Sequence, residues 1–400
     1  MQASRMSDLK VPPRVLMGPG PSDVDPRVLR ALGMPLLGHL DPAFLAIMND
    51  IMEALRGVFQ TANRLTLPVS GTGSAGMETL LVNLLEPGDR ALVVVQGLFG
   101  QRMVDAARRC GAETHVVEAP WGEAVDPAAV ERKLGQVPGP VKLMAAVHAE
   151  TSTGVLQPIR PLADIAHRAG ALLVMDCVTS LGGCPVEVDA WEVDAAFSGT
   201  QKCLSCPPGL APITLNARAE ECVRARRQPV QSWYLDLTMV MSYWGQERVY
   251  HHTAPVSMLY ALREALQLVL EEGLESRFQR HRLGSQALAA GLEAMGLQLL
   301  VAPEFRLPSL TTVTIPAGVD ELRVRRELLQ DCGIEIGGGL GPLKGRVWRI
   351  GTMGYSCQQK NILLLLAAME QALRRQGRES PPGAGARAAD AAYVAARPGA

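Results

Sequence analysis

Aromatic residues are scarce in this 400-residue chain, and long apolar runs are missing. Phe, Trp and Tyr make up 4% of the residues, although hydrophobic residues as a whole make up 48%. No apolar stretch approaches the ~18 residues of a membrane span. No apolar signal core follows residues 1–6. We therefore expect a cytoplasmic protein with no membrane partner.

Excess charge of either sign and a cysteine framework are also missing. The net charge is −1, so the composition gives no bulk attraction for nucleic acid or anionic lipid. Eight cysteines are scattered without regular spacing, which is typical of reduced thiols. Cys203 and Cys206 form a Cys-x-x-Cys pair, but no second pair and no ligand-spaced histidines accompany it. We expect no nucleic-acid partner and no metal.

Short apolar stretches alternate with helical patterns through the first two thirds of the chain. Near-continuous apolar strands between helices are typical of an α/β fold, with a mostly parallel sheet covered on both faces. An amphipathic helix over 256–272 closes this part. The expected strands lie at 65–69, 91–95, 142–147, 171–175 and 195–197.

The pattern changes after Gly273. A helix over 282–295, strands near 310–315, 333–336 and 346–350, and a last helix over 359–374 indicate a smaller α+β domain. Residues 377–400 are rich in Gly, Ala, Pro and Arg and have almost no large apolar side chains, which favours disorder. We expect an N-terminal arm (1–14), a large α/β domain (15–273), a small C-terminal domain (274–376) and a disordered tail (377–400).

Gly71, Gly73 and Gly76 spell Gly-x-Gly-x-x-Gly between an expected strand and an expected helix. As a dinucleotide fingerprint, the pattern also needs an acid about 20 residues on to bind a ribose. The next strand ends without one, which argues against an NAD-dependent dehydrogenase. What remains is a helix N-terminus flanked by the hydroxyls of Thr72 and Ser74. Such a loop suits a single phosphate, although a tight turn with a capping serine is a common alternative.

Lys202 stands between an apolar segment (195–197) and a rigid turn (207–209). The chain otherwise prefers arginine to lysine. A desolvated amine holds its proton less tightly and becomes a nucleophile. Taken alone, the segment favours an ordinary loop lysine. Together with the glycine-rich loop, it favours a phosphate-bearing cofactor that reacts with an amine, such as pyridoxal phosphate.

Pyridoxal phosphate needs two further partners, and the sequence offers a candidate for each. A carboxylate keeps the pyridine nitrogen protonated, so that the ring acts as an electron sink. Asp176 directly follows the expected strand 171–175, and the next strand ends close to Lys202. Phe99 is available to stack on the ring. Alone, such an acid more often caps a helix or turn, and such a phenylalanine more often lies in the core.

Several short stretches carry a resemblance to a known family. They are Gly18-Pro-Gly-Pro-Ser22, Ser70 to Gly73, Glu150-Thr-Ser-Thr-Gly154, Asp176 with Ser180-Leu-Gly-Gly183, Ser198-Gly-Thr-Gln-Lys202, Tyr250-His-His-Thr253 and Arg349-Ile-Gly351. From about residue 15 to 374, the chain resembles a class V, fold-type I aminotransferase of the alanine/serine–glyoxylate group. The resemblance implies the PLP-dependent transferase fold of type I, with pyridoxal 5'-phosphate (PLP) as cofactor. It also implies transfer of an amino group from alanine or serine to glyoxylate.

The resemblance implies that one group of residues binds the cofactor's phosphate. Thr72, Gly73 and Ser74 would hold it, with Gln201 beside them.

A second group would bind the ring. Lys202 would bind the cofactor covalently, Asp176 would pair with the ring nitrogen, and Thr151 would approach the ring hydroxyl. Phe99 and Val178 would pack on the two ring faces, although relatives often carry tryptophan in place of Phe99.

The remaining matches concern the substrate and a second subunit. Gly18, His39 and Arg349 would line the substrate site, with Arg349 gripping the α-carboxylate. Tyr250 and Thr253 would reach the phosphate of the neighbouring subunit's cofactor. The resemblance therefore implies a homodimer with shared active sites.

A ureidoglycine–glyoxylate aminotransferase is the nearest alternative. The resemblance to those enzymes is close, and it includes the stretch Gly38-x-x-Asp41-Pro-Ala-Phe44. They tend to have amides where this chain has His39 and Tyr250, which favours alanine or serine as donor.

Two other classes fit the sequence less well. A cysteine desulfurase needs a cysteine in a flexible loop, whereas Cys332 and Cys357 lie beside expected helices and strands. A catalytically silent binding protein has no use for Lys202, Asp176 and Arg349 together.

Overall fold

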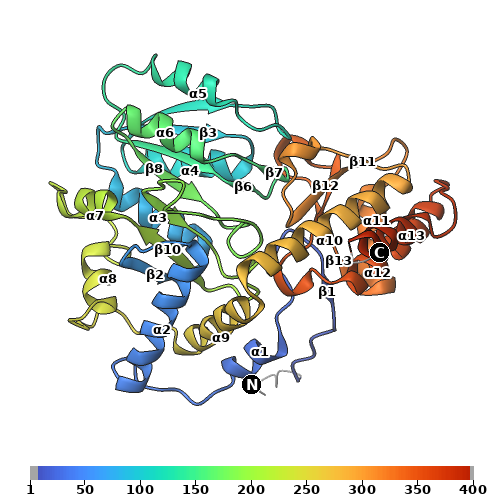
Figure 1. Ribbon diagram of the computed structural model, residues 1–400, viewed down its shortest axis with the longest axis horizontal. Helices are drawn as coiled ribbons and strands as arrows, with labels where there is room; N and C mark the ends of the chain where they lie inside the picture. The colour runs from blue at the N-terminus through green and yellow to red at the C-terminus, as the bar shows by residue number, and fades with distance from the viewer. Residues whose placement is uncertain (1–7, 397–400) are drawn as a thin grey trace, which may run out of the picture.

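A seven-stranded sheet forms the centre of the larger part of the molecule (Figure 1). The computed structural model describes residues 8–396. The strand order is β2-β10-β9-β8-β5-β3-β4. Strand β10 is antiparallel to both neighbours, and the pairings from β9 to β4 are parallel, as expected. The strands are β2 (Leu65–Ser70), β10 (Leu210–Leu215), β9 (Ala195–Phe197), β8 (Leu172–Asp176), β5 (Leu143–Val147), β3 (Arg90–Val95) and β4 (Glu113–Glu118).

Helices cover both faces of this sheet (Figure 1). Strands β5, β8 and β9 are buried along their whole length, which explains their unbroken apolar sequences. The helices of this part are α1 (Pro26–Leu32), α2 (Pro42–Phe59), α3 (Gly73–Leu84), α4 (Leu98–Arg109), α5 (Pro127–Leu134), α6 (Arg160–Arg168), α7 (Ala217–Arg224), α8 (Leu237–Trp244) and α9 (Val256–Glu272).

Three of these helices begin with the dipeptide Asp-Pro. In α1, α2 and α5 an aspartate side chain accepts a hydrogen bond from the backbone N–H two residues on, at 2.7, 2.8 and 3.0 Å. Proline then fills the first helical position, where its missing N–H costs nothing and its fixed φ suits the helix. The aspartates are Asp25, Asp41 and Asp126.

The second part of the chain has its own sheet and its own core. Its antiparallel sheet has the order β11-β12-β15-β14, and a separate apolar cluster packs around Trp348. The elements are α10 (Leu274–Ala294), β11 (Gln298–Leu299), β12 (Leu310–Thr314), α11 (Glu321–Cys332), β13 (Ile334–Glu335), β14 (Gly337–Gly338), β15 (Val347–Gly351) and α12 (Gln359–Arg374). Two short hairpin strands, β6 (Ala149–Glu150) and β7 (Val155–Leu156), pair with each other in the first part.

The N-terminal strand belongs with this second part. Strand β1 (Val15–Leu16) runs parallel to β13, and Met17 lies in the apolar cluster of the second part. In Figure 1 the blue β1 lies among the orange and red elements. We expected residues from 15 onward to belong to the large domain, but β1 packs with the second part instead. The boundary that we expected at Gly273 falls between α9 and α10.

The disorder that we expect for residues 377–400 is wrong for the described residues up to 396. They include α13 (Ala384–Ala395), which packs on α10 and α12, with Ala389 fully buried. The backbone N–H of Gly383 donates to Glu370 Oε1 at 2.9 Å, and Gln359 Nε2 donates to Asp390 Oδ1 at 3.0 Å. Alanine is a strong helix former, and small side chains permit close helix packing, so this composition forms a docked helix. Residues 397–400 lie outside the described part.

Within residues 8–396, every helix falls short of the length or the apolar character needed to cross a bilayer.

The close contact between α10 and α13 gives a first prediction. A Cβ on Gly291 would clash with Leu366 Cδ1 in α12 and would lie 2.8 Å from the carbonyl oxygen of Gly385 in α13. The nearest atom to a Cβ on Gly57 in α2 would be 3.6 Å away. Gly291→Ala should lower the melting temperature by roughly 2–6 °C, because overpacking outweighs the gain in helix propensity. Gly57→Ala is the matched control and should leave the melting temperature unchanged or raise it. Equal melting curves for the two variants would contradict a tightly docked α13.

Candidate active site

The predicted site residues gather at one edge of the central sheet. Asp176 ends β8 and pairs in register with Phe197 of the parallel strand β9, which leads into the turn before Lys202. The loop before α3 approaches the same place. A Cβ on Gly73 would lie 3.3 Å from Val178 Cγ2 and 3.5 Å from Gly199 Cα. The ends of parallel strands meet at one edge, so these separate segments form a single site.

Lys202 is buried beneath the turn that follows β1. Its side chain is 8% exposed, and its Nζ donates a hydrogen bond to the carbonyl oxygen of Pro19. Gly20 has a φ of +107°, which favours glycine, and a Cβ there would lie 2.6 Å from Nζ. Burial, together with the charge of Arg349, lowers the pKa of Lys202 to about 8. An amine with such a pKa is a much better nucleophile at neutral pH than an exposed lysine.

Asp176 is buried on the same edge with few partners of its own. Its carboxylate accepts a hydrogen bond from the backbone N–H of Val178 at 2.9 Å. Burial, and to a lesser degree the nearby Glu150, raise the pKa of Asp176 to about 7. A positively charged ligand group beside this carboxyl would favour its ionised form.

The start of α3 has the features of an anion site. Thr72 is the N-cap residue, yet its side chain makes no capping hydrogen bond, and the first N–H groups of a helix have no intrahelical acceptors. Beside it, Gln201 Oε1 is buried without a hydrogen-bond partner among residues 8–396. A buried amide without a partner indicates that a ligand completes its hydrogen bonds. Ser74, the second residue of α3, is exposed and available to the same ligand.

The backbone at Phe99 is held by the carboxylate of Glu150, a residue to which the sequence analysis gave no role. Glu150 is fully buried, and it accepts hydrogen bonds from Phe99 N at 3.2 Å and Gly100 N at 3.3 Å. It therefore caps α4, whose N-cap residue Gly97 has no side chain to do so. Burial raises the pKa of Glu150, and hydrogen bonds from Ser152 oppose that rise. The only sequence signal was the position of Glu150 inside a matched stretch.

Arg349 joins the small sheet to this site. It lies on β15 with 6% exposure, and it donates to Gly338 O at 2.8 Å and to Thr151 O at 3.0 Å. Burial lowers the pKa of Arg349 to about 10, while Glu150 raises it. These bonds use Nε and Nη1, which leaves Nη2 for a carboxylate. Gly18 lies alongside, because a Cβ on Gly351 would meet its carbonyl oxygen.

Thr151 contributes its hydroxyl as well as its carbonyl. The Oγ1 atoms of Thr151 and Thr179 form a hydrogen bond. Thr151 is buried between the Arg349 side chain and the loop that follows β8. It therefore lies on the same side of the site as Asp176.

The segment around Tyr250 is not brought to Lys202 within one chain. Tyr250 is 54% exposed. Its ring centroid lies 5.0 Å from the ring centroid of His39, and its hydroxyl oxygen lies 3.4 Å from Thr253 Oγ1. The segment is tied to the phosphate loop only indirectly, through a 2.7 Å hydrogen bond between His252 Nε2 and Ser70 Oγ. His39, Tyr250 and Thr253 therefore form a surface group at the edge of the site.

A family model for the class-V aminotransferases matches residues 29–344. The chain belongs to this family. The enzyme is therefore an aminotransferase, and its cofactor is pyridoxal phosphate. The NAD-dependent reading of the glycine pattern is not supported by this match.

The enzyme is similar to two kinds of curated relative. It is 46% identical to the (S)-ureidoglycine–glyoxylate transaminase of Bacillus subtilis, over 92% of each chain. It is 44% identical to the alanine–glyoxylate aminotransferase of Mus musculus, over 92% of this chain and 89% of the mouse protein.

Solved structures show the same two similarities. The ureidoglycine–glyoxylate aminotransferase of Bacillus subtilis superposes with a TM-score of 0.95 at 46% identity, covering 97% of this chain and 100% of that one. The alanine–glyoxylate aminotransferase of Nostoc sp. superposes with a TM-score of 0.91 at 49% identity, covering 93% and 98%. These likenesses confirm the expected type I fold.

The site's chemistry fits the cofactor. The unpartnered amide of Gln201 and the N-terminus of α3 suit a phosphate, and the carboxyl of Asp176 suits a protonated ring nitrogen. Lys202 offers a buried amine with a lowered pKa between them. These features are properties of the chain itself.

The raised pKa of Asp176 gives a second prediction, for full-length protein freed of cofactor. Its pKa rises from 3.8 when unfolded to about 7 when folded, so the folded state binds more protons and wild type loses stability as the pH rises through this window. Asp176→Asn resembles the protonated form and should be more stable than wild type at pH 8, but not at pH 4. Urea unfolding at both pH values measures the difference. A constant difference between the proteins at the two pH values would contradict the shift.

Proposed function

We propose that the enzyme transfers an amino group from alanine or serine to glyoxylate, giving glycine and pyruvate or hydroxypyruvate. The carrying observation is the buried Arg349, whose Nη2 has no hydrogen-bond partner among residues 8–396 and whose charge acts on Lys202. It offers a clamp for a substrate carboxylate. Glyoxylate has no side chain, so a clamp and a small enclosure suffice for it. Relatives named alanine–glyoxylate aminotransferase support this choice.

We assign the cofactor contacts to the residues gathered at the sheet edge. Thr72, Gly73, Ser74 and Gln201 hold the phosphate.

Phe99 and Val178 would pack against the faces of the ring. Thr151 would approach its hydroxyl, Asp176 would keep its nitrogen protonated, and Lys202 would form the covalent link. In this arrangement Gly18 and His39 border the substrate.

The protein's own groups divide the work of the reaction. When bound, pyridoxal phosphate supplies an electron sink for the electrons left at the donor's Cα. Arg349 holds the donor's carboxylate, which fixes Cα near Lys202. Lys202 Nζ accepts the proton from Cα in one half-reaction and donates one to Cα in the other. Its lowered pKa suits both tasks near neutral pH.

Transamination of ureidoglycine is the second candidate, because one similar relative carries that name. A ureido group has several N–H donors and a carbonyl oxygen, which a side-chain amide pairs with well. His39 and Tyr250 offer no amide, and their rings already contact each other at 5.0 Å. This pair favours a methyl or hydroxymethyl group in the enclosure.

We also propose a cytoplasmic homodimer with shared active sites. Large apolar side chains are exposed in two segments around the surface group, at Leu29, Met34, Leu36, Leu40, Trp233, Tyr234, Val249 and Tyr250. Exposed apolar surface of this kind is typical of a protein interface. If a second copy bound there, Tyr250 and Thr253 of each subunit would reach the cofactor phosphate of the other subunit.

A donor comparison tests the proposed reaction. With glyoxylate as acceptor, alanine or serine should exceed ureidoglycine by about tenfold or more in kcat/KM, a difference of about 1.4 kcal/mol in transition-state binding. All donors are measured at one pH, with Lys202→Ala as the control for enzyme dependence. A higher kcat/KM for ureidoglycine would overturn the proposal.

Mixing two inactive subunits tests the shared site. Lys202→Ala and Thr253→Ala proteins are each assayed alone at limiting cofactor and then after subunit exchange. In a shared-site heterodimer, one site carries both changes and the other carries neither. Activity of the mixture should therefore exceed the sum of the separate activities. Mere additivity after confirmed exchange would show that Thr253 does not serve the partner's site.

A further inference from the structure

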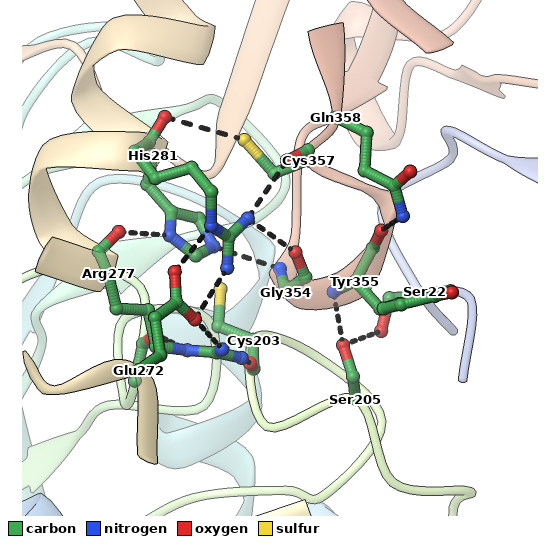
Figure 2. Close-up of polar contacts among 12 residues, drawn as sticks. Ser22, Cys203, Ser205, Glu272, Arg277, His281, Gly354, Tyr355, Cys357 and Gln358 are labelled. Atoms are coloured by element: carbon green, nitrogen blue, oxygen red, sulfur yellow. Dashed lines mark hydrogen bonds and ion pairs between the residues drawn. The ribbon is translucent and has the colours of Figure 1, made fainter. Parts of the chain in front are cut away.

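Charged groups where α9 meets α10 contact the loop that carries Lys202, next to Cys203 (Figure 2). Arg277 is buried, whereas the side chains of Glu272 and Arg280 are 26% and 34% exposed. Glu272 ends α9, and Arg277 and Arg280 lie on α10. The Glu272 carboxylate pairs with Arg277 Nη1 at 2.6 Å and with Arg280 Nε at 2.5 Å. The proposed function assigns no role to these groups.

Arg277 binds the loop that carries Lys202. Its Nη2 donates to the carbonyl oxygen of Cys203, the residue directly after Lys202, at 2.5 Å. Its Nε donates to Gly182 O at 2.8 Å, in the loop after β8. Arg277 is 5% exposed, so all three of its nitrogens are engaged away from water. One guanidinium therefore fixes two loops of the site relative to α10.

A second set of bonds holds the same loop from the other side. Ser22 Oγ donates to the carbonyl oxygen of Lys202 at 2.8 Å. Ser205 Oγ lies 3.2 Å from Ser22 Oγ and accepts a hydrogen bond from Tyr355 N at 2.7 Å (Figure 2). The backbone carbonyls of Lys202 and Cys203 therefore each accept a hydrogen bond from a side chain, Ser22 and Arg277 respectively.

The loop that begins at Gly354 is tied to the same cluster. Arg280 Nη1 donates to the carbonyl oxygens of Gly354 and Cys357, both at 2.9 Å, and Gly354 N donates to His281 Nε2 at 2.9 Å. A Cβ on Gly354 would lie 2.8 Å from Cys203 O, so the two loops are in close contact. Glu272, which pairs with both arginines, thus links the Lys202 loop to this second loop.

We propose that Arg277 is a positioning residue, which holds the Lys202 loop so that the lysine amine stays buried beneath the turn at Pro19. Lysine cannot replace it, since one ammonium group cannot reach the Cys203 and Gly182 carbonyls and Glu272 with the geometry of a planar fork. The proposal rests on the assigned role of Lys202 in the proposed function. The test uses cofactor-free protein, so that it remains decisive whatever the donor is.

The reactivity of Lys202 reports its burial. The groups that act on its pKa are Arg349, Cys203 and Asp176, besides burial, which is the largest cause. If the loop loosens, the amine gains water and its pKa rises from about 8 toward 10.5. Arg277→Lys keeps the positive charge, so a rise in this variant reflects position and not charge.

The experiment measures acetylation of Lys202 in full-length, cofactor-free protein between pH 6 and 11, followed by mass spectrometry of the Lys202 peptide. Exposed Lys344 in the same sample serves as the internal reference. In Arg277→Lys the midpoint should rise by roughly one pH unit or more, in the direction of an unperturbed lysine. Recovery of the chromophore on adding pyridoxal phosphate should also slow.

Arg226→Lys is the matched control. Arg226 Nη1 also donates to two backbone carbonyls, those of Asn83 and Leu85, but these lie at the far end of α3. This variant also exchanges a guanidinium that binds backbone carbonyls, and it should keep the wild-type midpoint. Superimposed labelling curves for Arg277→Lys and wild type would overturn the proposal. If Arg277→Lys fails to fold, Glu272→Gln replaces it, and a wild-type midpoint in Glu272→Gln would count equally against the proposal.

Discussion

Burial of charged groups at one edge of a parallel sheet is the constraint on which this enzyme depends. Lys202, Asp176, Glu150 and Arg349 are each at most 8% exposed. Buried charges are costly unless hydrogen bonds or opposite charges compensate them. The surrounding loops supply several such bonds to Glu150, bonds to two of the three guanidinium nitrogens of Arg349, and only one bond each to Lys202 and Asp176. The reactive pair is therefore the less compensated one, as pKa tuning requires.

The two parts of the chain meet through these same groups. Arg349 comes from the small sheet but donates to Thr151 in the large part, and β1 leads from the small part directly into the turn over Lys202. Arg277 and Arg280 make the corresponding link behind the lysine. A movement of the second part therefore changes the surroundings of the lysine amine from two sides. In the proposed role of Arg349, a substrate carboxylate bound there would act on both parts at once.

Local patterns in the sequence were enough for the sheet. They also marked Lys202 and Asp176 as candidates at strand ends and turns, although each pattern alone favoured a structural role. Arg349 and Thr151 came only from resemblance, since a strand arginine and a loop threonine have no local signal of function. Glu150 and Arg277 received no role from the sequence, because their partners are distant along the chain. Glu150 accepts from the backbone N–H of Phe99, 51 residues earlier, and Arg277 donates to the carbonyl of Cys203, 74 residues earlier. The tail was misjudged for the opposite reason. Its composition is that of a disordered segment, but α13 is stabilised by glycine contacts on a helix nearly 100 residues earlier, between Gly385 and Gly291.

The shifts of Lys202 and Asp176 explain how the chain tolerates its own site. Burial lowers the pKa of the amine to about 8 and raises that of the carboxyl to about 7, so each group approaches neutrality near physiological pH. Neutral groups cost less to bury than charged ones. In the proposed site, a cationic ring nitrogen beside Asp176 would restore the ionised form of that carboxyl. The low pKa of Lys202 comes chiefly from its burial. In its proposed role, the desolvation that costs folding free energy would also prepare the lysine as a base.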